Sequence, residues 1–79
     1  MTSFEQIEED IIVVVELSVP PFTEIERARV QHFIDVGEYG LALEAAVHTY
    51  ADGRKQASPQ AREVVRKLAS VMDVELPAI

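Results

Sequence analysis

The 79-residue chain contains no cysteine, no tryptophan and no long hydrophobic run. Without cysteine there can be no disulfide framework, no thiolate zinc site and no thiol nucleophile. The longest unbroken apolar run, residues 11–15, is far shorter than the roughly 20 residues that span a bilayer. The first residues also lack the basic and apolar segments of a signal peptide. We therefore expect a cytoplasmic protein with a single helical domain over residues 1–79.

Basic residues are missing from the first third of the chain. Residues 1–26 contain seven acidic residues and no lysine or arginine, whereas residues 27–79 contain seven of each sign. The whole net charge of −7 therefore belongs to residues 1–26. An acidic surface repels phosphate backbones and anionic lipids, so we expect no binding to nucleic acid or membranes. Such a surface favours a cationic protein partner, although solubility alone also explains it.

Residues that would carry catalysis or hold a metal do not form a recognisable pattern. His48 and Asp52 lie one helical turn apart but have no third ligand, so we expect no metal site. No serine stands in a strained elbow or beside an obvious base, and no glycine-rich phosphate loop is present. The sequence therefore predicts no enzymatic activity and no cofactor.

The apolar residues that are present recur at helical spacing. Four segments show this spacing, near residues 3–17, 24–36, 40–52 and 59–73. The five β-branched residues at 11–15 also suit a buried strand, but no second convincing strand is available to pair with it. The sequence therefore predicts an all-α fold, a small four-helix bundle with short loops and no sheet. The expected core is Ile7, Ile11, Val14, Phe33, Ile34, Leu43, Val47, Tyr50, Val65 and Leu68.

Capping residues mark the expected helix ends. The N-cap candidates are Ser3, Thr23 and Ser58. Glu26 completes the Thr-x-x-Glu capping box, and the Pro20–Pro21 pair ends the first helix. Gly37 and Gly53 are suited to end the second and third helices, because glycine adopts a left-handed backbone without a steric penalty.

Residues 34–45 place two glycines around an acid and an aromatic residue at a corner between two helices. Gly37 and Gly40 are expected to be structural there, Glu38 to lie near the positive N-terminus of the following helix, and Tyr39 to cover the core. The stretch also resembles the signature of the MafI family, which are small helical immunity proteins of bacterial polymorphic-toxin systems. The matching residues are Ile34, Asp35, Gly37, Glu38, Tyr39, Gly40, Leu41, Ala42, Leu43 and Glu44.

The resemblance implies a non-enzymatic inhibitor that binds a cognate toxin domain inside the cell. It does not identify the toxin, because related immunity proteins pair with varied toxin domains. The alternative is a small acidic interaction or homodimerisation module without a toxin partner. A shared signature can also preserve only the corner around which these proteins fold.

Two groups of residues are candidates for binding a protein partner. The first lies opposite the expected core face of residues 3–17 and comprises Glu5, Glu9, Ile12, Val13 and Glu16. The second lies around the corner and comprises Asp35, Glu38, Tyr39 and Glu44. An apolar centre within a charged rim is typical of an interface. Two alternatives remain: the aliphatic pair packs under a loop, or the acids pair with the basic residues of segment 59–73.

Overall fold

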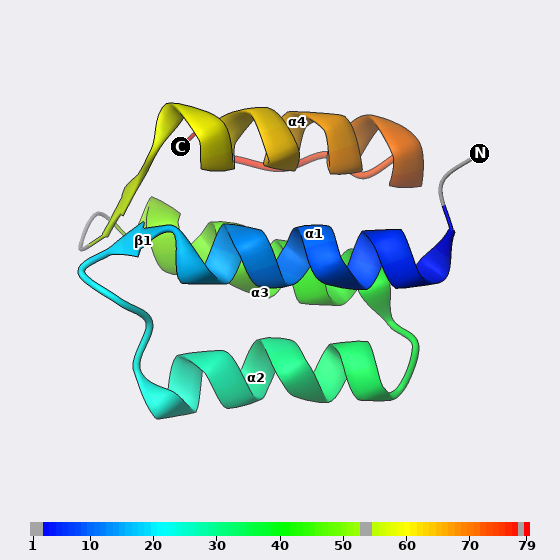
Figure 1. Cartoon of the computed structure of the whole chain (residues 1–79), viewed down its shortest axis with the longest axis horizontal. Helices are drawn as coiled ribbons and strands as arrows, with labels where there is room; N and C mark the ends of the chain where they lie inside the picture. The colour runs from blue at the N-terminus through cyan, green and yellow to red at the C-terminus, as the bar shows by residue number, and fades with distance from the viewer. Residues whose placement is uncertain (1–2, 53–54, 78) are drawn as a thin grey trace.

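The computed structural model describes residues 3–52, 55–77 and 79. Over these residues the chain forms four α-helices and one two-stranded sheet (Figure 1). The elements are α1 (Phe4–Glu16), β1 (Ser18–Val19), α2 (Glu24–Asp35), α3 (Tyr39–Ala51), β2 (Gln56–Ala57) and α4 (Pro59–Met72). Helix α1 lies across the middle of the molecule in front of α3, with α4 along one flank and α2 along the other (Figure 1). The four predicted helices are confirmed.

The predicted caps explain where the helices begin. The side chains of Ser3 and Ser58 accept hydrogen bonds from backbone amides at the starts of α1 and α4. Thr23 and Glu26 form the complete capping box: the Glu26 amide donates to the Thr23 hydroxyl at 3.2 Å, and the Thr23 amide donates to the Glu26 carboxylate at 2.8 Å. Each contact satisfies a backbone donor that the helix itself leaves without a partner. Gly53, the expected terminator of α3, lies outside the described residues.

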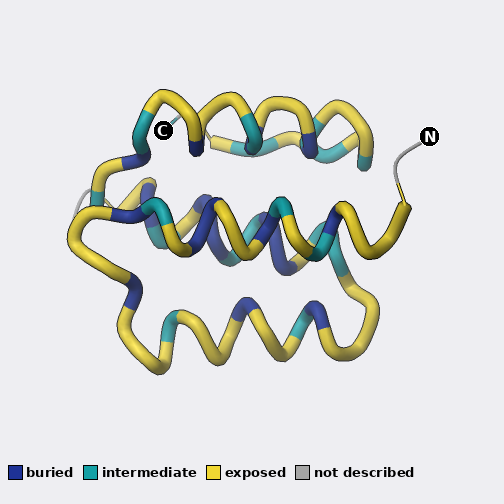
Figure 2. The backbone as a smooth tube through the Cα atoms, viewed as in Figure 1, coloured by how far each residue is buried: buried dark blue, intermediate teal, exposed yellow. Residues whose placement is uncertain are grey.

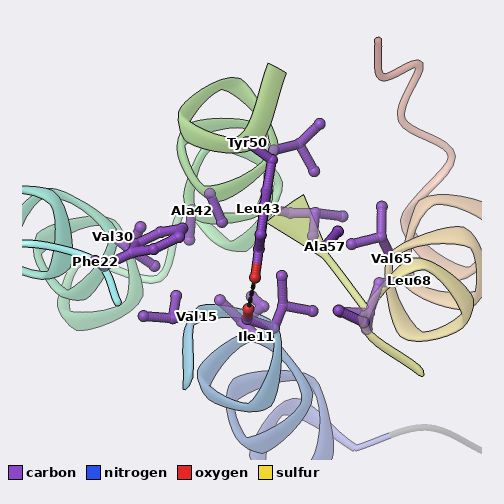
Figure 3. Close-up of a cluster of buried hydrophobic side chains, with 14 of the residues drawn as sticks. Ile11, Val15, Phe22, Val30, Ala42, Leu43, Tyr50, Ala57, Val65 and Leu68 are labelled. Atoms are coloured by element: carbon purple, nitrogen blue, oxygen red, sulfur yellow. Dashed lines mark hydrogen bonds between the residues drawn. The ribbon is translucent and has the colours of Figure 1, made fainter. Parts of the chain in front are cut away.

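The prediction that the fold contains no sheet is wrong. Strand β1 pairs antiparallel with β2, with Ser18 opposite Ala57 and Val19 opposite Gln56. Helix α1 therefore ends before Pro20 is reached, because the backbone at Ser18 has turned to pair with β2. The Tyr50 hydroxyl donates a hydrogen bond to the Val14 carbonyl, the dashed line in Figure 3. It replaces the amide that a longer helix would have supplied.

Buried apolar side chains from α1, α2, α3, α4 and β2 meet in one cluster (Figure 3). All of the predicted core residues except Phe33 are buried. Phe33 is only half-buried because it lies at the edge of the inward face of α2, which buries Val30 and Ile34. Phe22 was not predicted to be in the core. This loop residue is 4% exposed, and its ring packs edge-on against the Tyr50 ring with 5.4 Å between the ring centroids.

The chain after α4 turns back along that helix (Figure 1). Leu76 and Ile79 are partly buried against the core cluster. Val74 lies beside the start of α3, where its Cγ2 atom is 3.6 Å from the position that a Cβ on Gly40 would occupy. The C-terminal segment therefore adds apolar cover to the α3–α4 side of the core.

Candidate partner-binding surface

The acidic stripe, defined as Glu5, Glu9, Ile12, Val13 and Glu16, runs along the solvent side of α1. All five residues are exposed. The side chains of Ile12 and Val13 keep 40% and 37% of their surface in contact with solvent, so the alternative that they pack under a loop is wrong. The structure thus brings the first group of predicted binding residues together on one helix face.

The basic residues of α4 do not neutralise this stripe. Helix α4 packs along α1, as the second alternative required, but its Lys67 ammonium reaches Asp10 at 3.3 Å. Asp10 lies between the stripe and α4 and is not part of the stripe. Within the described residues no salt bridge or side-chain hydrogen bond involves Glu5, Glu9 or Glu16. Their carboxylates therefore remain available to a cationic partner.

A groove of about 550 Å³ separates α1 from α2. Buried Val15, Val30 and Ile34 form its floor, and the exposed side of Ile12 forms part of one wall. The rest of the lining is polar apart from Ala28 of α2: Glu16 comes from α1, and Glu24, Arg27 and Gln31 come from α2. Of the residues of α2, only Asp35 was predicted to bind a partner, and it is not among the residues that line the groove.

The groove exists because α2 packs mainly against α3 rather than α1. Helix α1 makes its principal contacts with α4 and α3. Helix α2 buries only Val30 and Ile34, and its outer residues are exposed along most of its length (Figure 2). Side chains of α1 and α2 therefore meet at the groove floor but not at its rim.

The corner between α2 and α3 is built on Gly37, which has a φ angle of +78°. The Gly37 amide donates to the Ile34 carbonyl at 3.0 Å, and the Glu38 amide donates to the Phe33 carbonyl at 2.8 Å. This pair of hydrogen bonds is the Schellman motif, in which a left-handed residue closes a helix. The structural role predicted for Gly37 is confirmed. Gly40 lies within α3 and has room for a Cβ beside Val74, so neither backbone angle nor space requires a glycine there.

Tyr39 joins the corner to the beginning of α1. Its hydroxyl donates to the Glu8 carboxylate at 2.8 Å, and its ring stacks on Phe4 with 5.6 Å between the ring centroids. This donation to a carboxylate raises the pKa of Tyr39, because the bond needs the protonated phenol. Tyr39 packs against the core cluster, as expected for a residue that covers the core. The contacts of Tyr39 with Glu8 and Phe4 were not predicted, because nothing in the local sequence pairs these residues with residue 39.

The other corner residues do not form one surface. Glu38 is the exposed N-cap of α3 and makes no side-chain capping hydrogen bond. Asp35 accepts a hydrogen bond from the Gln31 amide group at 2.8 Å and so lies on the side of α2 that borders the groove. Glu44 is half-buried on α3. Asp35 therefore continues the row of Gln31 on α2, whereas Tyr39 contacts the beginning of α1, and the second group is not one continuous surface.

No group of three or more histidine, aspartate or glutamate side chains is arranged to hold a metal ion in the part of the chain that the structure describes. Over the same residues, none of the helices combines the length and apolar character needed to cross a membrane. No family model, curated protein or solved structure matches this chain.

Proposed function

We propose that the chain is a small helical bundle that acts in the bacterial cytoplasm as an immunity protein. It binds a cognate toxin domain, such as a nuclease, and blocks it without catalysing a reaction. The resemblance of residues 34–44 to the MafI signature supports the class of partner. The observation that carries the proposal is the acidic stripe, whose three carboxylates surround exposed Ile12 and Val13 without an ion pair among the described residues.

This surface suits inhibition of a protein that acts on nucleic acid. Such a toxin presents a cationic surface to the phosphate backbone, and an acidic partner competes for that surface by its charge. Long-range attraction speeds encounter, whereas desolvated apolar side chains at the centre of the contact slow dissociation. The stripe supplies both kinds of residue on one helix.

Co-expression with the toxin domain encoded beside this gene tests the proposal. Wild-type protein should preserve host survival and bind the purified toxin domain. Reversing Glu5, Glu9 and Glu16 to lysine should slow association and weaken its dependence on salt. Glu63→Lys, on the exposed face of α4, is the matched control for the single reversal Glu9→Lys, because each changes the net charge by the same amount. Host death despite normal expression of wild-type protein would refute the proposed function.

A homodimerisation module is the second candidate, because the same exposed aliphatic pair can meet its copy across a two-fold axis. In that arrangement the acids of the two copies would repel each other. Neutralising Glu5, Glu9 and Glu16 with glutamine separates the candidates: it should strengthen self-association in a dimer, because the repulsion between the two copies is removed, but weaken binding to a cationic toxin. Sedimentation velocity measures the first effect and binding kinetics the second.

A further inference from the structure

The groove between α1 and α2 is long enough to hold one further helix. The two helices run side by side in opposite directions and are joined by residues 17–23 (Figure 1). They contain 13 and 12 residues. At 1.5 Å per residue, walls of this length accommodate roughly three turns of a third helix. An amphipathic helix in such a groove is a common mode of peptide recognition.

The lining of the groove is apolar where a docked helix would bury its own apolar face. Val15, Val30 and Ile34 form the floor, and Ile12 projects from the α1 wall. Ala28 stands on the opposite wall with a side chain of one methyl group, which lets a partner backbone approach closely. These features favour an occupant with aliphatic residues repeated at i, i+3 or i+4, and i+7.

The two rims carry the same spacing of residues and the same sign of charge. On α1 the row is Glu5, Glu9, Ile12 and Glu16; on α2 it is Glu24, Ala28, Gln31 and Asp35. Both rows step by four, three and four residues, which keeps their members on one face of a helix. Because the helices are antiparallel, Glu16 and Glu24 flank the end of the groove next to the connecting loop, and Glu5 and Asp35 lie toward the other end.

Two carboxylates, Glu16 and Glu24, line the groove against one base, Arg27. Exposed Glu5, Glu9 and Asp35 continue the same two rows beyond the lining, so acids outnumber bases along both rows. A second copy of this chain would bring these acids against their equivalents, a repulsive arrangement. A helix with lysine or arginine on both edges of its apolar face would be attracted by Glu16 and Glu24 at the loop end of the groove and by the acids that continue each row. The acidic rows thus favour a positively charged occupant, and the apolar floor favours an amphipathic helix.

We infer that the α1–α2 groove binds a cationic amphipathic helix of the partner protein. The inference rests on the proposed function, since it specifies which element of a toxin the immunity protein takes. It also divides the acidic stripe. Ile12 lines the groove and contacts the bound helix, whereas Val13, its neighbour with nearly equal exposure, does not line the groove. The partner surface extends to Ala28 and Gln31 of α2.

A designed peptide tests the groove without knowledge of the toxin. The probe is a helix-stabilised peptide of about 14 residues with leucines along one face and lysines on both edges. One control peptide has glutamate in place of lysine; another keeps the composition but scatters the leucines around the helix. NMR titration of the lysine peptide should shift the signals of Ile12, Ala28 and Gln31, and neither control should do so. Equal shifts with the scattered peptide would overturn the inference, because they would show attraction by charge alone.

The neighbouring aliphatic residues supply the matched variants. Ile12→Ala should weaken binding of the lysine peptide about tenfold, the effect of losing an interface anchor, and Val13→Ala should leave it within about twofold. Ala28→Glu places a larger charged side chain in the α2 wall and should abolish the leucine-dependent part of binding. Circular dichroism checks that each variant remains helical. Equal losses from Ile12→Ala and Val13→Ala would overturn the inference.

The same variants in the toxin assay separate this inference from the proposed function. If the adjacent toxin binds and Val13→Ala weakens it as much as Ile12→Ala does, the groove inference fails while the immunity function stands. If the lysine peptide occupies the groove but wild-type protein gives no protection from the toxin, the immunity function fails while the groove's preference for a cationic helix stands. If Ile12→Ala instead abolishes self-association, a second copy is the occupant and the inference is overturned.

Discussion

The two flanks of α1 are built in different ways. Toward α4, the flank is closed by fully buried Leu68 and by the Lys67–Asp10 ion pair above it. Toward α2, the aliphatic residues at the floor are buried, but the outer side chains of the two helices do not meet, which leaves a groove. Both flanks belong to the same helix, and α1 presents apolar residues on each of them. The difference shows that burial along a helix depends on how its neighbour is held, and not only on its own pattern.

Helix α2 is held at its ends and by α3. At its start, the Lys55 ammonium binds the Glu26 carboxylate at 3.0 Å, and Phe22 anchors the preceding loop in the core. At its end, the Schellman motif at Gly37 turns the chain into α3. A helix positioned in this way does not need to interdigitate with α1, which is why a groove can persist beside a well-packed core.

The largest loss of stability is expected at Leu68 on the closed flank. Leu68→Ala should lower the free energy of unfolding by about 2–5 kcal/mol, because it opens a cavity in a packed interior. Ile12→Ala on the open flank should cost less than about 1 kcal/mol, since its side chain already meets solvent. Urea denaturation of both variants measures the difference. Similar losses would mean that the two flanks are equally packed.

Tyr50→Phe tests the hydrogen bond at the C-terminal end of α1, where the Tyr50 hydroxyl donates to a carbonyl of the last turn. The variant keeps the ring in contact with Phe22 but removes the donor to the Val14 carbonyl. Leaving this carbonyl without its donor in the core should cost about 1–3 kcal/mol. Denaturation measures it, with Tyr39→Phe as a control that removes a partly exposed hydroxyl. A smaller loss at Tyr50 than at Tyr39 would contradict the assigned role.

The corner glycines test whether α2 is held by its ends. Gly37→Val should lower stability by about 1–2 kcal/mol, because a β-branched residue resists a positive φ angle and no other strain is introduced. Gly40→Ala should be neutral or raise stability by up to about 1 kcal/mol, since alanine is the better helix former and has space. Thermal melts compare the two. Identical melting of Gly37→Val and wild-type protein would remove Gly37 from the anchoring of α2.

The smallest expected effect is the pH dependence at the start of α2. Hydrogen bonding by the Thr23 amide, followed by Lys55, lowers the pKa of Glu26 below its usual value of 4.5. This carboxylate therefore stabilises the fold above pH 4.5, and the contribution is lost as the pH falls through the lowered pKa. Glu26→Gln keeps an oxygen acceptor for the cap and should flatten the loss of stability in acid. Parallel acid dependence in the two proteins would show that this anchor contributes nothing.

Local signals in the sequence were sufficient for the helices and their caps. Thr23 with Glu26, Ser58 with Pro59, and Gly37 each determine a boundary through neighbouring backbone groups, so short patterns predict them. The pairing of β1 with β2 brings together residues nearly forty positions apart. Each strand has only two residues, which is too short for the alternation of polar and apolar residues that would predict a strand.

The candidate surface was predictable in part for the same reason. Helical spacing placed Glu5, Glu9 and Glu16 on one exposed face of α1. The row from Glu24 to Asp35 has the same spacing, but its position opposite α1 depends on the tertiary arrangement of two helices. Spacing predicts which residues share a face; it does not predict which faces border one groove.

The short sheet also has a consequence for the order of folding. Helices α2 and α3 are neighbours in sequence and can associate across a tight corner, whereas the β1–β2 clasp closes only after a long loop has been restrained. Contacts between elements close in sequence form at a lower entropic cost. We therefore expect the α2–α3 hairpin to form early and the docking of α1 with α4 to come late. In stopped-flow kinetics, substitutions within the hairpin should mainly slow folding, and those between α1 and α4 should mainly speed unfolding.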